Sequence, residues 1–214
     1  MDTCKKNKSI DFFHNDIDID LYSLYKNSSS LAIDTEAMGL VHGRDRLCLV
    51  QMADAKGTVH LIQIEKNQKQ AKNLERLMTD EDVVKIFHYA RFDIGVLHRN
   101  LNFMTRNIYC TKIASKLART FSQSHGLKNL VKEILAIDIS KEQQSSYWGI
   151  DTLDENQINY AKQDVLYLHQ IKKHLDNILK REDRYDIFEK ICYFLPARCE
   201  LDDMGWEDID PFSH

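Results

Sequence analysis

An aspartate and a glutamate one residue apart, Asp34 and Glu36, are the first residues in this sequence that suggest chemistry. They lie in residues 31–40, an apolar stretch that predicts a short buried strand followed by a turn at Gly39. Alternate side chains of a strand share a face, so the two carboxylates point the same way. Like charges this close repel each other, and burying either without a counter-charge is costly. A divalent cation such as Mg2+ or Mn2+ resolves both problems; an exposed strand end is the simpler alternative.

A third carboxylate, Asp164, lies on a helix predicted over residues 155–180. At three- and four-residue spacing it falls within an apolar stripe that we expect to face the core. A carboxylate there is costly unless it is paired or binds a metal, which makes Asp164 a candidate ligand. Tyr160 lies one turn earlier on the same face of this helix. The alternative to a metal ligand is that Asp164 forms a salt bridge and Tyr160 belongs to the core. The stripe consists of Ala161, Asp164, Leu168, Ile171, Leu175 and Ile178.

Asp93 is a fourth candidate, in the first turn of a helix predicted over residues 92–100 and after a buried strand predicted over residues 83–87. The helix dipole alone favours an aspartate at this position. Its apolar neighbours, however, make a fully solvated role less favourable. His88 follows the strand and is a candidate metal or phosphate contact, although a hydrogen-bonded structural histidine is the commoner situation.

The predicted elements that must position these residues are mainly strands in the first part of the chain and mainly helices in the second. Tight turns between the early strands indicate an antiparallel meander, with an edge strand before it. Helices that then alternate with a further strand indicate an α/β domain with helices packed on a sheet. The predicted strands are residues 10–14, 31–36, 47–52, 58–64 and 83–87, and the predicted helices are residues 20–26, 71–78, 92–100, 111–118, 127–135 and 155–180.

Composition sets limits on the possible functions. The 214 residues suffice for one sizeable domain, and the net charge of −4 does not suggest a protein that holds nucleic acid by bulk positive charge. Local basic strips or bound metal would have to supply that attraction. No stretch is apolar enough to span a membrane, so we expect a cytoplasmic protein. The scattered cysteines indicate reduced thiols rather than a disulfide framework or a zinc site. They are Cys4, Cys48, Cys110, Cys192 and Cys199.

Asp34, Glu36, Asp93 and Asp164, taken in their order along the chain, resemble the catalytic residues of the DEDD superfamily of 3′–5′ exonucleases. Tyr160 and Asp164 match the Tyr-x-x-x-Asp form of its tyrosine branch, since Asn159 occupies the position where the other branch has histidine. Further segments resemble the bacterial ribonuclease D family, and the resemblance extends from about residue 10 to the C-terminal tail. These segments are residues 46–51 (RLCLVQ), 111–117 (TKIASKL), 125–128 (HGLK) and 139–146 (ISKEQQSS).

The resemblance implies a ribonuclease H-like mixed sheet flanked by helices. It also implies a metal-dependent 3′–5′ exoribonuclease that acts on single-stranded RNA 3′ ends, tRNA precursors among them, and releases nucleoside 5′-monophosphates. Two divalent cations, Mg2+ or Mn2+, would be bound, with Tyr160 positioning the attacking water. Asp34, Glu36 and Asp164 would hold one ion. Asp34 would also hold the second, with Asp93 contributing through water.

The same resemblance implies several substrate contacts. A leucine at the position of Leu40 wedges against the terminal base in similar exonucleases, although a leucine covering the edge of the core explains it equally well. Lys112, Lys116 and Arg119 share a face of a predicted helix and can track phosphates, or form a solvated face. The implied substrate contacts are Thr35, Gly39, Leu40, His88, Phe92, Lys112 and Lys128.

For domain organisation, we expect an exonuclease domain over residues 1–195 and an acidic tail over residues 196–214. The tail would pack on the domain through Leu195, Leu201, Met204 and Trp206, leaving no room for the helical HRDC domains of longer ribonuclease D members. Tyr147 stands where the family usually has aspartate, and we interpret it as a position that does not bind metal. Two rival functions are the same chemistry on DNA and a non-catalytic nucleic-acid-binding module. The sequence does not indicate the oligomeric state.

Overall fold

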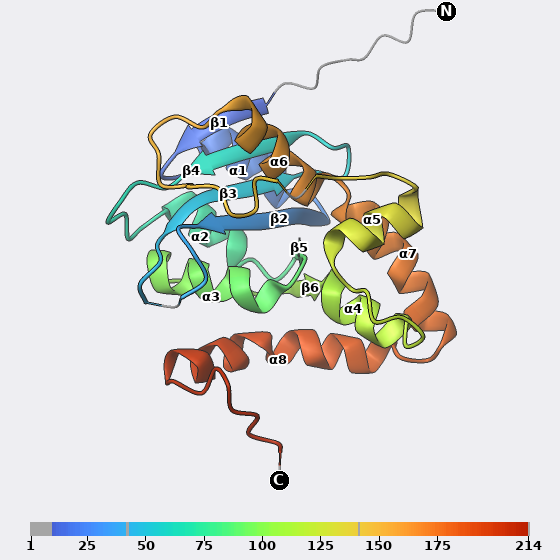
Figure 1. The fold of residues 1–214 in the computed structure, drawn as a ribbon. Coiled ribbons are helices and arrows are strands. Elements are labelled where there is room, and N and C mark those ends of the chain that lie inside the picture. Colours follow the sequence, from blue (N-terminus) through green and yellow to red (C-terminus); the bar gives the residue numbers. More distant parts are fainter. Residues whose placement is uncertain (1–9, 42, 141, 214) are drawn as a thin grey trace, which may run out of the picture.

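A six-stranded mixed sheet forms the centre of the computed structural model, which describes residues 10–41, 43–140 and 142–213 (Figure 1). The strand order is β1-β4-β3-β2-β5-β6. The strands are β1 (Ile10–His14), β2 (Ser30–Ala37), β3 (Leu47–Ala53), β4 (Val59–Gln63), β5 (Val84–Phe87) and β6 (Ile108–Cys110). β2, β3 and β4 form the predicted antiparallel meander, and β1 lies at the edge as predicted. The β1–β4, β2–β5 and β5–β6 pairs are parallel, so the sheet is mixed.

β2 and β3 lie at the centre of the sheet and are buried on both faces. All seven residues of β3 are buried, and Leu31, Ala32 and Ile33, which directly precede Asp34 in β2, are apolar and inaccessible. Central strands covered on both faces are nearly continuous apolar runs, and this is why both strands could be predicted. The carboxylates of β2 are therefore the exception to an otherwise apolar central strand.

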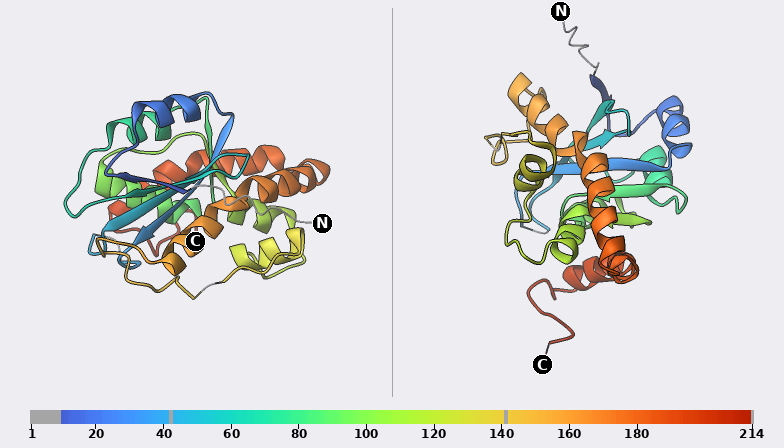
Figure 2. Two further views of the ribbon diagram at one scale, coloured as in Figure 1. Left: turned by 90° about the horizontal axis from the view of Figure 1, so that it is seen from above. Right: turned by 90° about the vertical axis from the view of Figure 1, so that its right-hand side faces the viewer.

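Helices cover both faces of the sheet. Figure 2 shows α1 and α2 on one side and α5 and α6 on the other. The ranges of α4 and α5 match the prediction, and none of the described helices combines the length and apolar composition that a membrane span needs. The helices are α1 (Ile19–Lys26), α2 (Lys72–Met78), α3 (Ala90–Leu101), α4 (Thr111–Ala118), α5 (Leu127–Leu135), α6 (Glu155–Leu166), α7 (Leu168–Arg181) and α8 (Tyr185–Asp203).

The single helix predicted over residues 155–180 is wrong, because the structure has two helices with a break at Tyr167. The break allows α6 to lie over β2 and β3 while α7 packs against α4 and α5. Leu168, Ile171 and Leu175 are buried as predicted. The last position of the buried stripe is Leu179 rather than Ile178, which is only half-buried.

The predicted start of the C-terminal tail at residue 196 falls inside α8, which continues through Pro196 to Asp203. Leu195 is buried as expected, but Met204 is 72% exposed and does not anchor the segment. Hydrogen bonds replace the expected apolar contacts. Arg91 donates to the Glu207 carbonyl at 2.7 Å, and Arg198 donates to the Trp206 carbonyl at 2.6 Å and the Ile209 carbonyl at 2.8 Å.

The cysteines that the structure describes agree with the prediction of reduced thiols. Cys48, Cys110, Cys192 and Cys199 are buried and free. Burial raises the pKa of Cys48 to about 11, so this thiol is unreactive at neutral pH. Cys4 lies outside the described residues.

Candidate active site

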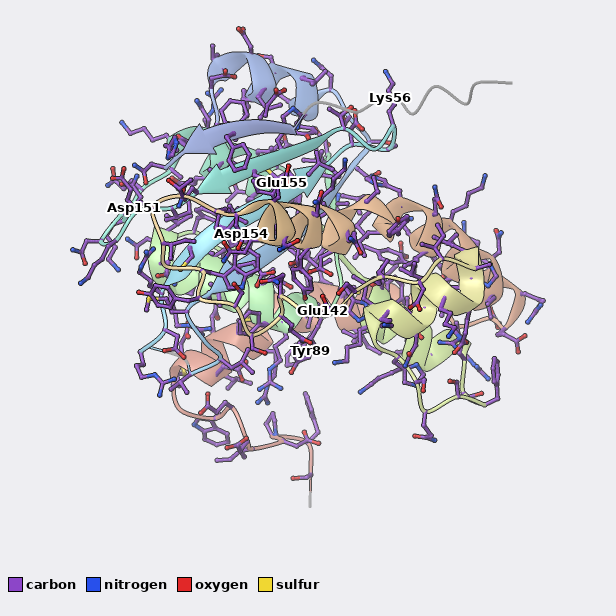
Figure 3. All side chains as sticks on the ribbon, turned by 45° about the horizontal axis from the view of Figure 1, so that its top comes forward. Lys56, Tyr89, Glu142, Asp151, Asp154 and Glu155 are labelled. Atoms are coloured by element: carbon purple, nitrogen blue, oxygen red, sulfur yellow. The ribbon has the colours of Figure 1, made fainter. Side chains whose placement is uncertain are left out.

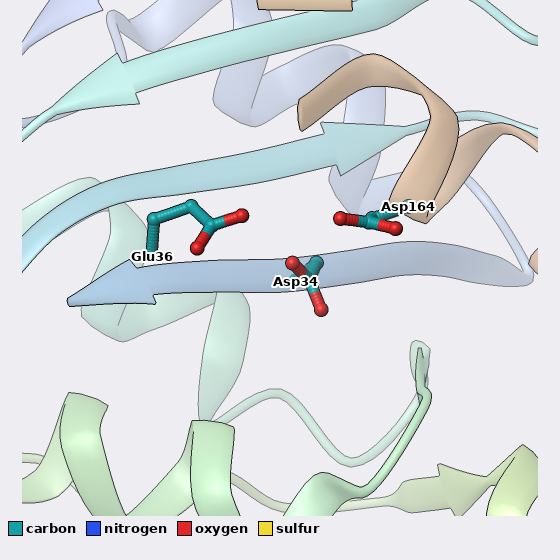
Figure 4. Close-up of side chains that lie close together, drawn as sticks. All are labelled: Asp34, Glu36 and Asp164. Carbon is teal, nitrogen blue, oxygen red and sulfur yellow. The ribbon is translucent and has the colours of Figure 1, made fainter. Parts of the chain in front are cut away.

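Three carboxylates from two elements converge at the centre of the sheet. Asp34 and Glu36 on β2 and Asp164 on α6 each offer an oxygen atom, and these atoms all lie within 4.8 Å of one another. Figure 4 shows Glu36 and Asp164 pointing toward each other along β2, with Asp34 between them. We call these three residues the acid cluster. The sequence predicted that distant acids meet, and for these three the geometry agrees.

The position of the acid cluster follows from the local structure of β2 and α6. The two-residue period of β2 places Asp34 and Glu36 on one face. α6 begins at a capping box, in which the Asp154 side chain accepts from the Gln157 amide at 2.9 Å and Gln157 accepts from the Asp154 amide at 3.1 Å. Figure 3 labels Asp154 at the start of this helix. This cap fixes the start of α6 over the sheet and hence the position of Asp164, further along the same helix.

The electrostatics of the acid cluster are unfavourable without a counter-charge. Burial, followed by the charges of Asp93, Asp164 and Glu36, raises the pKa of Asp34 well above its usual value. Burial and Asp164 likewise raise the pKa of Glu36. Both carboxyl groups therefore favour their protonated forms in the protein alone, and a bound cation would reverse this preference.

Asp93 lies beside the acid cluster but is held by a partner of its own. Thr35 donates a hydrogen bond from its hydroxyl to Asp93 Oδ1 at 2.8 Å, and Asp93 is only 2% exposed. Burial raises the pKa of Asp93 to about 8, although the hydrogen bond from Thr35 opposes this shift. The Thr35 side chain is buried and its hydroxyl is used by Asp93, so a substrate contact of Thr35 stays a prediction that concerns its backbone.

Tyr160 lies on α6 one turn before Asp164 and is 8% exposed. Burial and the charges of Asp164, Glu36 and Asp34 raise its pKa far above the usual value. The phenol therefore keeps its proton at neutral pH and can act as a hydrogen-bond donor. The indole of Trp148 packs nearby, with ring centroids 6.1 Å apart.

Gly39 and Leu40, just beyond β2, have different roles in the structure. A Cβ atom on Gly39 would lie 2.3 Å from Asp45 Oδ2, so glycine leaves room here for the Asp45 carboxylate, and its predicted contact with substrate stays a prediction. Asp45 in turn accepts a hydrogen bond from the Val41 amide at 2.9 Å. Leu40 is 78% exposed, which excludes the alternative that it covers the edge of the core.

The remaining predicted substrate contacts have partners within the protein. His88 Nδ1 lies 2.9 Å from the Thr111 hydroxyl, as expected for a structural histidine. The Lys112 ammonium lies 4.0 Å from the centre of the Tyr89 ring. Lys128 forms an ion pair with Asp138 at 3.3 Å. The half-buried Phe92 packs against the apolar core.

The suggestion that Arg119 tracks phosphates is wrong, because its side chain is buried. Arg119 donates to the Ser115 hydroxyl at 3.1 Å and to the Ser124 carbonyl at 3.0 Å, and it is paired with Glu133 of α5. It therefore fixes the connection between α4 and α5. Lys116, on the same helix, is exposed.

Gln51 is a site residue that the sequence analysis did not single out. It is fully buried on β3 directly opposite Asp34, and its Nε2 lies 3.4 Å from Asp34 Oδ2 and 3.5 Å from Glu36 Oε1. Its Oε1 has no hydrogen-bond partner among the described residues. Gln51 thus supplies a neutral donor to two carboxylates. A glutamine within an apolar strand was the available signal.

Comparison with known proteins agrees with this geometry. Residues 14–180 match the family model described as 3′-5′ exonuclease. A ribonuclease D from Sphingobium indicum is 30% identical over 159 residues, which are 74% of this chain and 41% of that protein. The chain thus spans about two fifths of the length of this curated relative.

Solved structures give the same fold. NrnC from Brucella melitensis has a TM-score of 0.91 and 46% sequence identity over 96% of this chain and 98% of that chain. NrnC has also been solved with bound Mg2+ and bound to pGG. Ribonuclease D from Escherichia coli, at 21% identity and a TM-score of 0.75 over 90% of this chain and 50% of that chain, shares the fold.

Proposed function

This chain belongs to the 3′–5′ exonuclease family of DEDD nucleases, and we propose that it is a metal-dependent exoribonuclease that removes nucleoside 5′-monophosphates from RNA 3′ ends. The observation that carries the proposal is the acid cluster, whose oxygen atoms lie within 4.8 Å of one another. RNA is favoured as substrate because the curated relative is a ribonuclease D and NrnC has been solved bound to pGG.

The donor set of the acid cluster fits Mg2+ or Mn2+. All its donors are carboxylate oxygens, which hard divalent cations prefer. Burial, followed by the charges of the neighbouring carboxylates, raises the pKa values of Asp34 and Glu36, and a cation would offset both effects. Asp34, Glu36 and Asp164 would hold one ion, and Asp34 with Asp93 through water would hold a second. When bound, such ions activate water and stabilise the charge on the leaving oxygen. The Mg2+-bound structure of NrnC supports this assignment.

The side chains of this protein would orient the reactants. Tyr160 keeps its proton, so its hydroxyl would position the attacking water rather than remove a proton from it. Asp93 is fixed by Thr35, which reduces the entropy lost when a ligand is bound. Leu40 projects from the end of β2 and would contact the terminal base.

A digestion series tests the proposal directly. RNA and DNA strands of the same sequence, labelled at the 5′ end, are incubated with the protein and with Mg2+, Mn2+ or chelator, alongside pGG. We expect a ladder that shortens from the 3′ end of RNA only when metal is present. Faster shortening of the DNA strand would favour the DNA alternative, and binding without cleavage of any strand would favour a non-catalytic module.

Tyr160→Phe tests the role of the phenol. We expect kcat on RNA to fall about a hundredfold with little change in KM, because the ring still packs but the water loses its orienting donor. Steady-state kinetics measure the two constants separately. Tyr22→Phe is the matched control, since Tyr22 is a buried tyrosine on α1 that contacts Arg76 through its ring. A rise in KM at constant kcat would contradict the proposed role.

Gln51→Leu tests the donor opposite Asp34. We expect Mn2+ to bind about tenfold more weakly, because partners that orient metal ligands typically contribute roughly 10–100-fold to affinity. Calorimetric titration of the metal-free protein measures this without any substrate. Met52→Leu, at the next and equally buried position of β3, controls for altered core packing. Equal Mn2+ affinity in the Gln51 variant and wild type would show that Gln51 has only a packing role.

A further inference from the structure

A cavity of about 720 Å³, which Met38 lines two residues beyond Glu36, is not used by the chemistry described above. Most of its lining comes from three loops, through Met38 and residues within 44–47, residues 63–69 and residues within 147–151, and His14 and Asn100 complete it. In Figure 1 these loops gather at the end of the sheet where the arrow of β2 ends, and Figure 3 labels Asp151 on one of them. The cavity is within the size range of small-ligand sites.

The cavity is close to the acid cluster along the chain and in space. Met38, which lines it, follows Glu36 by two residues, and at ~3.4 Å per residue this places them about 7 Å apart. Tyr147 and Gly149 also line the cavity, whereas Trp148 between them packs toward Tyr160. Residues 147–149 thus contribute to the cavity through Tyr147 and Gly149 and to the surroundings of Tyr160 through Trp148.

The charge of the cavity is opposite to that of the acid cluster. Arg46 is held in place because it donates to the carbonyls of Leu47 at 3.0 Å and Ile64 at 2.8 Å. Arg44 is paired with Asp45 at 2.7 Å, but no ion pair joins Arg46 or the exposed lysines of the cavity to a carboxylate of the described residues. The charged residues that line the cavity are Arg44, Arg46, Lys66, Lys69, Glu65 and Asp151.

We propose that this cavity binds the sugar–phosphate backbone of the RNA strand on the 5′ side of the bond that is cut. This inference rests on the proposed function, because it locates the part of the strand that extends away from the acid cluster. Lysine and arginine side chains hold backbone phosphates whatever the sequence. The Tyr147 ring, on a residue that is 59% exposed, offers a base a stacking surface. In a protein with a net charge of −4, such a local basic site adds to the attraction that bound metal would supply for RNA.

The double variant Lys66→Gln/Lys69→Gln tests the inference. Binding is measured by fluorescence anisotropy in an Asp34→Asn background, which keeps the RNA intact, and hydrolysis is measured in the otherwise wild-type protein. We expect affinity for a longer single-stranded RNA to fall about tenfold. The slope of log affinity against log salt should decrease by about 1.4, which is about 0.7 for each phosphate that is no longer neutralised. The kcat/KM for pGG should fall much less than the affinity for longer RNA, because pGG places only one nucleotide on the 5′ side of the bond that is cut.

Two matched variants complete the experiment. Lys26→Gln/Lys173→Gln removes the same charge from exposed positions on α1 and α7, and it should bind and cleave as wild type does. Lys66→Arg/Lys69→Arg should retain the affinity for longer RNA. Unchanged affinity and salt slope in the glutamine variant would overturn the inference, and so would an equal loss on pGG and longer RNA. If wild-type protein cleaves neither RNA, the proposed function fails, whereas the binding comparison still tests the cavity.

Discussion

Asp34→Asn is expected to slow RNA hydrolysis at least about a thousandfold, which is about 4 kcal/mol, and at the same time to stabilise the metal-free protein. The substitution keeps the shape of the side chain but removes a charge that both proposed metal positions share. The charged form of Asp34 is disfavoured by burial and by Asp93, Asp164 and Glu36, and this raises its pKa. The neutral amide relieves that repulsion, so the residue most needed for catalysis destabilises the protein without metal.

Opposite changes in activity and stability distinguish this expectation from a simple loss of folding. Kinetics on labelled RNA give the first quantity, and thermal unfolding in chelator gives the second. Asp20→Asn, an exposed aspartate in the first turn of α1, is the matched control and should leave the rate of hydrolysis unchanged. An Asp34 variant with near wild-type turnover, or with a lower melting temperature in chelator, would contradict the assignment.

The sequence was most informative where short-range periodicity determines structure. The two-residue period of β2 placed Asp34 and Glu36 together, and apolar spacing set the ranges of α4 and α5. The break at Tyr167 was not predictable in the same way, since Leu166 and Leu168 on either side are good helix formers. That break reflects tertiary packing, because α6 lies on the sheet and α7 on α4.

Long-range partners within the site were the least predictable features. Gln51 faces Asp34 only because of the register between β2 and β3, and a slip of one residue would move it to the other face. The hydrogen bond from Thr35 to Asp93 joins residues 58 positions apart. The sequence predicts either a phosphate contact or a solvated position for Arg119, because nothing near it in the chain indicates that it pairs with Glu133 of α5. The grouping of the four acids came from family resemblance, which carries long-range information that one sequence lacks.

Removal of metal is expected to stop hydrolysis and to make protein stability depend strongly on pH. The pKa of Asp93 is raised from 3.8 to about 8, and those of Asp34 and Glu36 are also raised. Between pH 3.8 and about pH 8 the folded protein binds more protons than the unfolded chain. The free energy of unfolding therefore falls as pH rises through this range. The stability that the protonated carboxyl groups contribute is fully present below the usual carboxyl pKa of 3.8 and is lost as pH passes about 8. Thermal unfolding in chelator across this range measures it.

Added Mg2+ should reverse this trend, because it binds the folded acid cluster and competes with protons. Stabilisation by a ligand that binds only the folded state grows with its affinity, and that affinity rises as the carboxyl groups lose their protons. The increase in melting temperature on adding Mg2+ should therefore be largest at the alkaline end of the range. Asp34→Asn isolates the contribution of the acid cluster from that of other titrating groups, since the variant should show a weaker pH dependence and a smaller response to Mg2+. Identical pH profiles for the variant and the wild type in chelator would show that the cluster is already neutralised by other means, and would remove the electrostatic reason for placing the metal there.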